Sequence, residues 1–257
     1  MQFNSFERRV IDHVTKTPRP GRSSAKSALR HLERAYKLSD EMPEIAIFLG
    51  ITAEEEAATA VFHSLKRRKY EGARELNYRS HVHKAALLPF VLAIGKRLDT
   101  FPQLRQPIFL FDTKHSPDKQ ERLRLRFTID GPDGPLWLYP LPPLELSART
   151  NGEALNFAPE LAEIAKEKNA ESILRHVEDL ANRRNLVLYA GAKGMPVIDS
   201  AAKFLAYRRW VVFAHLVTYL LIDAYPEKQA FAQQALDALL TMLRSPRARK
   251  LEAGTAE

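Results

Sequence analysis

Two arginines and two histidines lie within one ten-residue stretch and form the most reactive combination of side chains in the sequence. They are Arg74, Arg79, His81 and His83. Imidazole takes up and releases protons near neutral pH, and guanidinium binds phosphate through parallel hydrogen bonds, so together they suit cleavage of a ribonucleotide chain. The structural alternative is that His83 is a hydrogen-bonded core residue and His81 an exposed one.

The spacing of these four residues predicts two Arg–His pairs if residues 74–94 form one helix. Arg79 and His83 are four positions apart and can touch. They lie toward the apolar side, where the helical pattern places Leu76, Leu87, Phe90 and Ile94. Arg74 and His81 are seven positions apart and lie near one line on the opposite face. One pair is therefore expected to point inward and the other outward.

Three consecutive glutamates lie in the middle of the helix predicted at residues 43–68. This helix has apolar residues at nearly every angle, so we expect it to be central and substantially buried. Glu54, Glu55 and Glu56 point in directions about 100° apart on a helix, so at least one must face protein. A buried carboxylate is costly unless it is paired, which predicts a basic partner on a neighbouring helix. Glu55 or Glu56 is the candidate to orient a histidine or arginine of the 74–83 cluster.

Other kinds of chemistry are disfavoured by the residues present. The chain has no cysteine, which excludes disulfides, thiolate metal sites and cysteine nucleophiles. A carboxylate–histidine metal site could use Glu55, Glu56, His63, His81 and His83, but neither helix carries the Glu-x-x-His motif of di-iron bundles. The sequence also lacks a Gly-rich phosphate loop, an HExxH motif and a G-x-S-x-G elbow. We expect no metal and no cofactor.

Positive charge is concentrated in two segments. Lys and Arg outnumber Asp and Glu by 39 to 31, which gives a net charge of +8. Residues 1–37 hold nine basic and three acidic residues, and residues 63–84 hold seven and two. Such segments favour an anionic partner, most commonly nucleic acid, and we expect RNA. The alternative is an ordinary solvated basic surface.

Hydrophobic periodicity predicts a mainly α-helical bundle. We expect a basic leader at residues 1–22, a single helical domain at 23–244 and a disordered tail at 245–257. Residues 71–98 are expected to form one helix kinked at Pro89, which cannot donate a backbone hydrogen bond. The full set of expected helices covers residues 23–38, 43–68, 71–98, 158–168, 171–184, 199–224 and 226–244.

A small β-hairpin insertion is expected at about residues 101–143. Residues 122–129 alternate strictly between polar and apolar side chains, which predicts a strand. The turn-rich residues 130–134 predict a loop of more than two residues before the return strand, LWLYPL, whose Pro140 and Pro142 indicate a sheet edge. The strand places Arg122, Arg124 and Arg126 on one face, either as a binding surface or as an ordinary solvated face.

No targeting or membrane-spanning segment is expected. The first residues lack the apolar core of a secretory signal. The most apolar stretch, residues 210–222, is shorter than the roughly 20 residues that cross a bilayer, so we interpret it as a buried core helix. We expect a soluble cytoplasmic protein.

Four segments, spread over residues 25–98 and 170–225, resemble in order the abortive-infection AbiV-like proteins of the HEPN helical class. They are ERAYKL, PEIAIFLGITAEEEAATAVF, YRSHVHKAAL and RRNLVLYAGAKGMP. By this resemblance, Glu55 and Glu56 match the acidic pair of the family, and His81 and Lys84 match its His-x-x-Lys motif. The chain departs from the pattern at Ala58 and Thr59, where the family has glycine and lysine. The hairpin lies outside the resemblance.

The resemblance also extends to a late motif and to an activity. Tyr189 and Pro196 match the late Arg…Leu-Tyr…Gly…Pro signals of the family. HEPN proteins are often metal-independent ribonucleases that use an arginine, four to six residues and a histidine. Arg74 and His81 are separated by six residues and fit this spacing, whereas Arg79 and His83 do not. Family spacing therefore prefers the outward pair, and helical burial prefers the inward one.

Two hypotheses follow from these observations. In the first, the chain is a phage-defence or toxin-like protein, a homodimer that binds RNA and cleaves it without metal. In the second, it is a non-catalytic module that binds nucleic acid or protein, as many HEPN-like proteins do, with Lys84 and the Arg122, Arg124 and Arg126 face as binding residues. The sequence leaves open whether the chain is an enzyme.

Overall fold

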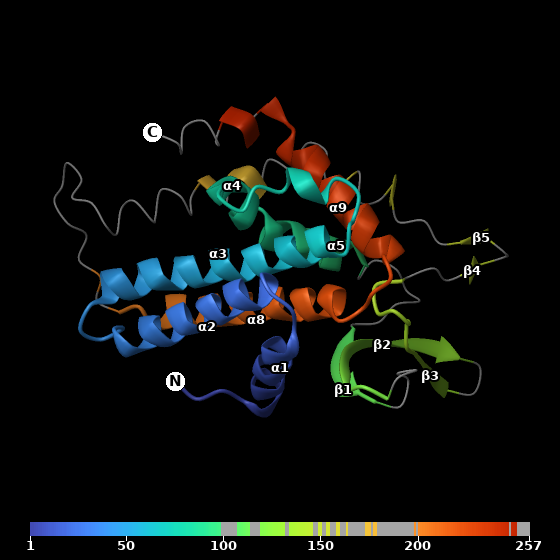
Figure 1. The fold of residues 1–257 in the computed structure, drawn as a ribbon, viewed down its shortest axis with the longest axis horizontal. Coiled ribbons are helices and arrows are strands. Elements are labelled where there is room, and N and C mark those ends of the chain that lie inside the picture. The colour runs from blue at the N-terminus through green and yellow to red at the C-terminus, as the bar shows by residue number, and fades with distance from the viewer. Residues whose placement is uncertain are drawn as a thin grey trace.

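The chain folds into a helical bundle with a small antiparallel sheet at one end (Figure 1). This computed structural model confirms the expected mainly α class with a β-hairpin. It describes residues 1–98, 107–113, 119–131, 134–145, 149–150, 153–154, 158–159, 163, 173–175, 177–178, 198, 200–246 and 248–250. Tyr189, Pro196 and most of the expected helices at 158–168 and 171–184 lie outside the described residues.

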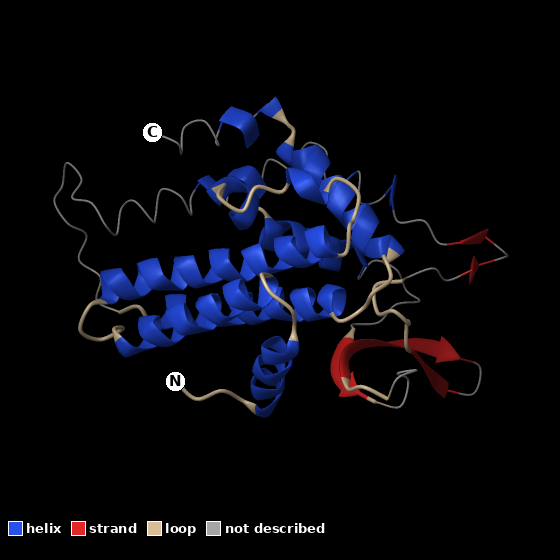
Figure 2. Ribbon diagram, in the orientation of Figure 1, coloured by secondary structure: helices blue, strands red, loops and turns tan. Residues whose placement is uncertain are grey.

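Three long helices form the centre of the bundle (Figure 2). They are α2 (Gly21–Lys37), α3 (Pro43–Arg67) and α8 (Ala202–Asp223), and α3 packs against both of the others. Apolar residues occur all round α3, and its buried positions fall on every side of the helix. The expectation that this helix is central and substantially buried is confirmed.

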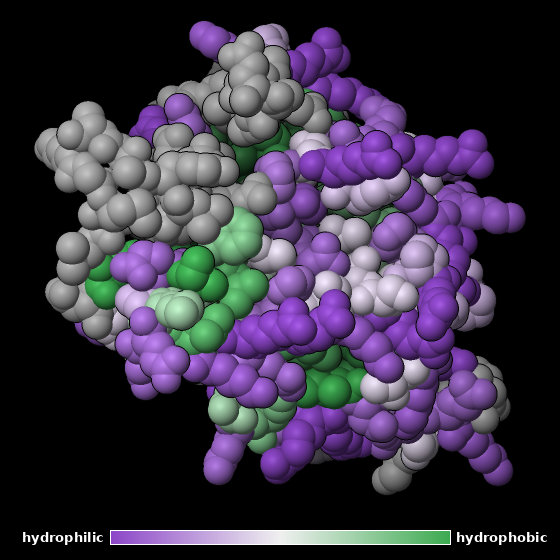
Figure 3. Space-filling model, turned by 60° about the vertical axis from the view of Figure 1, so that its left-hand side comes forward, coloured by the Kyte–Doolittle hydropathy of each residue, from purple (hydrophilic) through white to green (hydrophobic). Residues whose placement is uncertain are grey.

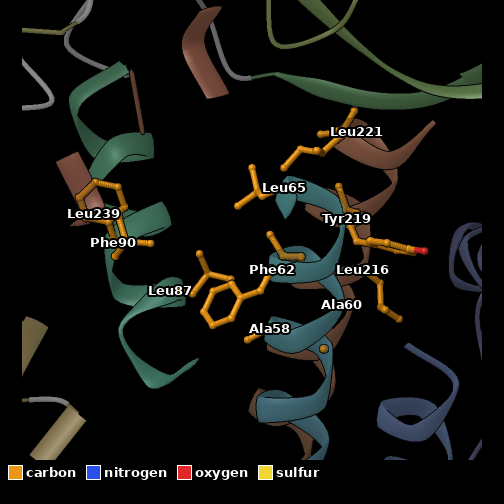
Figure 4. Close-up of a cluster of buried hydrophobic side chains, with 14 of the residues drawn as sticks. Ala58, Ala60, Phe62, Leu65, Leu87, Phe90, Leu216, Tyr219, Leu221 and Leu239 are labelled. Carbon is orange, nitrogen blue, oxygen red and sulfur yellow. The ribbon is translucent and has the colours of Figure 1, made fainter. Parts of the chain in front are cut away.

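The core continues from these helices to the C-terminal part of the chain. Phe62 and Leu65 of α3 lie between the side chains of α8 on one side and those of α5 (Leu87–Leu98) and α9 (Ala230–Leu243) on the other (Figure 4). Helix α9 (Ala230–Leu243) begins four residues later than expected. Residues 245–250, expected in a disordered tail, include a helical turn at 248–250 with Ala248 buried. The rest of that tail lies outside the described residues.

The expected basic leader contains a packed helix, α1 (Ser5–Lys16). The Asn4 side chain accepts a hydrogen bond from the Glu7 backbone N–H, and the Glu7 carboxylate accepts one from Asn4 in return. This reciprocal cap fixes the start of the helix. Val10 and Val14 are fully buried in the main core, so α1 belongs to the bundle.

The expected single helix at residues 71–98 is wrong. The structure has a 3-10 turn at Ala73–Glu75, a short helix α4 at His81–Ala85 and a helix α5 at Leu87–Leu98. Gly72 adopts the left-handed conformation with φ of 72°, and the Ser80 hydroxyl caps the start of α4. Pro89 lies in the first turn of α5, where a missing N–H breaks no internal bond, so it starts a helix rather than kinking one.

The sheet consists of β1 (Ile108–Asp112), β2 (Arg122–Gly131) and β3 (Gly134–Leu138) in that spatial order. The antiparallel register pairs Gly131 with Gly134, so only two residues connect β2 to β3. The expectation of a loop longer than two residues is therefore wrong. Strand β3 lies at the edge, as predicted. Two further short strands, β4 (Arg149–Thr150) and β5 (Glu153–Ala154), pair with each other.

Strand β2 joins the sheet to the helices. Leu123, Leu125 and Phe127 are buried in the main core. The hydroxyl of Tyr225, just after α8, donates a hydrogen bond of 2.9 Å to the Leu123 carbonyl. On the other side, Phe111 of β1 stacks on His13 of α1 with ring centroids 4.6 Å apart. The sheet is therefore packed against α1 and the end of α8.

One helix, α8, is long and apolar enough to cross a membrane by length and composition alone, and 67% of its most apolar window is buried inside the fold. Buried core helices pass the same test. The exterior is largely hydrophilic, with apolar patches, on the face shown in Figure 3.

Candidate functional site

Glu55, His81 and Lys84 form a hydrogen-bonded cluster between α3 and α4. Oε1 of Glu55 lies 2.8 Å from Nδ1 of His81, and Oε2 of the same carboxylate lies 2.9 Å from Nζ of Lys84. Both carboxylate oxygens are thus engaged by positively charged or proton-donating groups. These are three of the residues that the sequence singled out, brought together from positions 26 and 29 apart.

The local structure explains why His81 and Lys84 point the same way. They are the first and fourth residues of α4, three positions apart, so they share one face of the helix. The start of α4 is fixed by the Ser80 hydroxyl, which accepts a hydrogen bond from the His83 backbone N–H. Glu55 faces α4 from the middle of α3.

The three side chains of the cluster differ in solvent exposure. The Lys84 side chain is 9% exposed and that of Glu55 is 13% exposed, whereas the His81 side chain is 34% exposed. Because the imidazole reaches the surface while its partners are buried, it is the member of the cluster that a substrate can approach.

The electrostatics of the cluster favour an ionised Glu55. Burial raises the pKa of the Glu55 carboxyl, but the hydrogen bond from His81 and the charges of Lys84 and His81 together lower it further. The net pKa lies below the ordinary value. A charged Glu55 accepts a hydrogen bond from Nδ1–H of His81, which holds the ring in one orientation and places the basic lone pair of the neutral ring on Nε2.

The other two glutamates have different surroundings, as their angular separation predicted. Glu54 is buried and forms an ion pair with the buried Arg208 of α8. Glu56 is half-buried near His31 of α2. The burial of His31 lowers its pKa, partly opposed by the charge of Glu56. The expected basic partner on a neighbouring helix therefore exists for two of the three carboxylates.

The two predicted Arg–His pairs do not form, because their residues do not share a helix. Arg74 lies in the 3-10 turn, is exposed and makes no hydrogen bond or ion pair among the described residues. Arg79 precedes α4, and its guanidinium lies 5.8 Å from the Tyr78 ring. Nδ1 of His83 accepts a hydrogen bond from the Asn77 backbone N–H, so His83 helps to hold the loop before α4.

Two of the residues expected to contact a ligand are buried. Lys84 is committed to Glu55 and positions that carboxylate. Arg124 of β2 is 0% exposed, and its three guanidinium nitrogens have no hydrogen-bond partner among the described residues. The arginine strand is therefore not a uniform solvated face. Arg122 and Arg126 are half-buried, and their guanidinium groups lie over the rings of Tyr225 and Trp137.

Sequence reasoning missed an aromatic residue beside the cluster. Tyr78 is 46% exposed, and its ring stacks on the His63 ring at a centroid distance of 5.9 Å. Nζ of Lys66 lies 5.5 Å from the same ring. The sequence did contain a signal for this residue, because Tyr78 lies only three residues before His81 in a segment with excess positive charge.

Within the part of the chain that the structure describes, no three histidine or acidic side chains are grouped closely enough to hold a metal ion. The expected metal candidates Glu55 and His81 do meet, but Lys84 occupies the second carboxylate oxygen. An ammonium group in that position opposes a cation. The arrangement instead suits proton transfer by an oriented imidazole.

No family model, curated protein or solved structure matches this chain.

Proposed function

We propose that this chain acts on RNA as a metal-independent endoribonuclease of the phage-defence type, with His81 as its proton-transfer residue. The observation that carries the proposal is the 2.8 Å contact between Nδ1 of His81 and the buried carboxylate of Glu55, with the imidazole itself partly exposed. The resemblance to AbiV-like HEPN proteins supports it, because the acidic pair and the His-x-x-Lys motif supply the three residues of the cluster.

The proposed reaction uses the substrate's own 2′-hydroxyl group as the nucleophile. Nε2 of His81 accepts the 2′-hydroxyl proton while that oxygen attacks the adjacent phosphorus. The bond from phosphorus to the 5′-oxygen breaks, the leaving oxygen takes a proton from water, and the His81 imidazolium returns its proton to the solvent. The products are a 2′,3′-cyclic phosphate and a 5′-hydroxyl. Glu55 stabilises the imidazolium that forms.

A second candidate function is a non-catalytic RNA- or protein-binding module. The buried bond between Lys84 and Glu55 favours this alternative, because it ties α4 to α3 and serves the fold without any chemistry. In that case His81 completes a structural connection.

Incubation of the purified protein with total RNA in EDTA distinguishes the two functions. We expect cleavage by the wild type and by His83→Ala, and a loss of about 100-fold or more in His81→Ala. His83→Ala is the matched control because it removes a neighbouring imidazole of α4 that does not contact Glu55. Absence of cleavage by the wild type, or equal cleavage by His81→Ala, rejects the catalytic function.

The proposal includes a homodimer in the cytoplasm. A second copy would cover the exposed part of His81 and narrow the site around an RNA strand. Sedimentation velocity measures the oligomeric state directly. A monomer at the protein concentration of the cleavage assay would reject the homodimer.

A further inference from the structure

A compact group of aromatic and cationic side chains lies beside the Glu55–His81–Lys84 cluster. Its members are His63 and Lys66 of α3 and Tyr78 and Arg79 of the loop before α4, and we call it the Tyr78 cluster. The Tyr78 ring is its centre, with the His63 ring at 5.9 Å, Lys66 Nζ at 5.5 Å and the Arg79 guanidinium carbon at 5.8 Å.

The loop that carries Tyr78 is held in place by hydrogen bonds at both ends. Lys66 donates a bond of 2.5 Å to the Leu76 carbonyl, which ties the loop to α3. Asn77 donates its backbone N–H to Nδ1 of His83, and its side-chain oxygen accepts the Arg79 N–H at 2.9 Å. The exposed tyrosine is therefore pre-positioned without help from a ligand, which limits the entropy lost on binding.

Part of the positive charge of residues 63–84 has no acidic partner in the portion of the chain that the structure describes. The two acidic residues of the 63–84 segment are paired elsewhere, Glu71 with Lys228 and Glu75 with Arg244. Arg67 and Arg68 are held by Asp223. Four cations of the segment have no acidic partner among the described residues: Lys66, Lys69, Arg74 and Arg79. Two of these four belong to the Tyr78 cluster.

The Tyr78 cluster also lies in line with the proposed catalytic residue. Lys66 follows Glu55 by eleven positions on α3, so the two residues are on nearly the same side of the helix, about 16 Å apart along its axis. Tyr78 precedes His81 by three positions. A polymer that reaches His81 can therefore extend along α3 to Tyr78.

From these observations we infer that the Tyr78 cluster is a binding subsite for single-stranded RNA, with one base stacked on Tyr78 and a neighbouring phosphate bound by Arg79 and Lys66. An exposed ring flanked by cations that have no acidic partner among the described residues is the combination that binds unpaired nucleotides, because every base has a face that stacks and every phosphate carries charge. Bases inside a duplex cannot stack on the ring. The inference rests on the proposed action on RNA and adds the strandedness of the substrate.

Fluorescence anisotropy with a labelled single-stranded oligouridylate, in EDTA and low salt, tests the subsite. The full chain carrying His81→Ala is used as the background so that the RNA stays intact. We expect Tyr78→Ala to weaken binding by at least about fivefold, and Tyr78→Phe to bind within about twofold of the background because it keeps the ring. Arg79→Ala is expected to reduce the slope of log Kd against log salt concentration by about 0.7.

The matched control is Tyr207→Ala. Tyr207 is 42% exposed on α8, and its ring also lies near a guanidinium, at 5.2 Å from Arg208. That guanidinium, however, is paired with Glu54. We expect Tyr207→Ala to bind like the background. An equal loss in both alanine variants would indicate a general effect on the fold and overturns the subsite.

Three other results overturn the inference: no binding of single-stranded RNA, tighter binding of a duplex of the same length, or no loss with Tyr78→Ala. None of these requires cleavage to be measured. If RNA binding depends on Tyr78 but the wild type does not cleave RNA, the subsite is supported and the endoribonuclease activity is rejected. The two proposals can therefore fail separately.

Discussion

Glu55 and His81 are 26 positions apart in the sequence, yet Oε1 of one lies 2.8 Å from Nδ1 of the other. The contact joins the middle of the central helix to the first residue of the short helix α4. Because Lys84 binds the second carboxylate oxygen, Glu55 holds α4 through both its first and its fourth residue. The same carboxylate thus orients the proposed catalytic imidazole and secures the helix that carries it.

Replacement of Glu55 by glutamine should destabilise the fold. Glu55→Gln keeps the size of the side chain but leaves Lys84, which is 9% exposed, without a counter-charge. We expect a loss of at least about 2 kcal/mol in the free energy of unfolding, measured by urea denaturation at pH 7. Glu56→Gln is the control, since Glu56 makes no hydrogen bond among the described residues, and should stay within about 0.5 kcal/mol of the wild type.

The destabilisation by Glu55→Gln should also depend on pH in a defined direction. The folded-state pKa of Glu55 lies below its unfolded value of 4.5, so its contribution to stability is complete above pH 4.5 and is lost as pH falls through the folded-state pKa. The difference between wild type and variant should therefore be constant from pH 6 to 7 and shrink below about pH 4.5. A difference that grows on acidification would contradict the ionised state assigned to Glu55.

The buried pair of Glu54 and Arg208 should show strong coupling in a double-mutant cycle. Both side chains are nearly inaccessible, and burial raises the pKa of Glu54 despite the nearby charge of Arg208. Glu54→Leu and Arg208→Met each leave one charge buried without its partner and should cost about 3 kcal/mol or more. The double variant removes both charges and should cost clearly less than the sum. Additive losses would show that the two side chains do not interact in solution.

The sequence predicted the elements whose pattern is dominated by burial. Helix α3 has apolar residues all round and is central, and the alternating residues 122–129 form β2. The pairing of a mid-helix glutamate with a basic group on a neighbouring helix was also predictable, since a buried carboxylate demands it. For the site, this reasoning identified Glu55, His81 and Lys84 and predicted that Glu55 or Glu56 orients a histidine or arginine of the 74–83 segment, as the Glu55–His81 contact does. It did not predict that Lys84 binds the same carboxylate.

The failures arose where local caps compete with hydrophobic periodicity. Leu76, Leu87 and Ile94 are all buried as the single-helix pattern required, yet the backbone from Gly72 onward turns instead of continuing as one helix. Gly72 and the Ser80 cap favour those turns, and periodicity does not detect them. The burial of Arg124 was not predicted for a different reason. Alternation along a strand identifies its polar and apolar faces, but segments distant in the sequence decide whether the polar face is covered.

Pro89→Ala tests the corrected boundary between α4 and α5 directly. Pro89 lies in the first turn of α5, where its N–H would have no internal partner, so alanine gains no hydrogen bond there. We expect a change of less than about 1 kcal/mol, in the direction of destabilisation, because alanine makes the unfolded chain more flexible. Urea denaturation measures it. A stabilisation of about 3 kcal/mol would instead support a proline in the interior of one long helix.

His215→Leu should make the protein less sensitive to acid. His215 is 1% exposed in α8, and neither ring nitrogen has a hydrogen-bond partner among the described residues. Burial lowers its pKa from 6.5 to about 3, so the folded state keeps the ring neutral. Stability from this group is complete above pH 6.5 and falls as pH drops toward 3, because the unfolded chain binds the proton first.

The buried His215 lowers the free energy of unfolding of the wild type by about 1.4 kcal/mol for each pH unit below 6.5. Between pH 8 and pH 5, the free energy of unfolding of His215→Leu should therefore rise by roughly 2 kcal/mol relative to wild type. Urea denaturation at both pH values measures this change. Thr218→Val is the control on the same helix, since it removes a hydroxyl that donates to the Ala214 carbonyl and does not titrate. If His215→Leu and Thr218→Val shift equally with pH, the ring of His215 is accessible to protons in the folded protein.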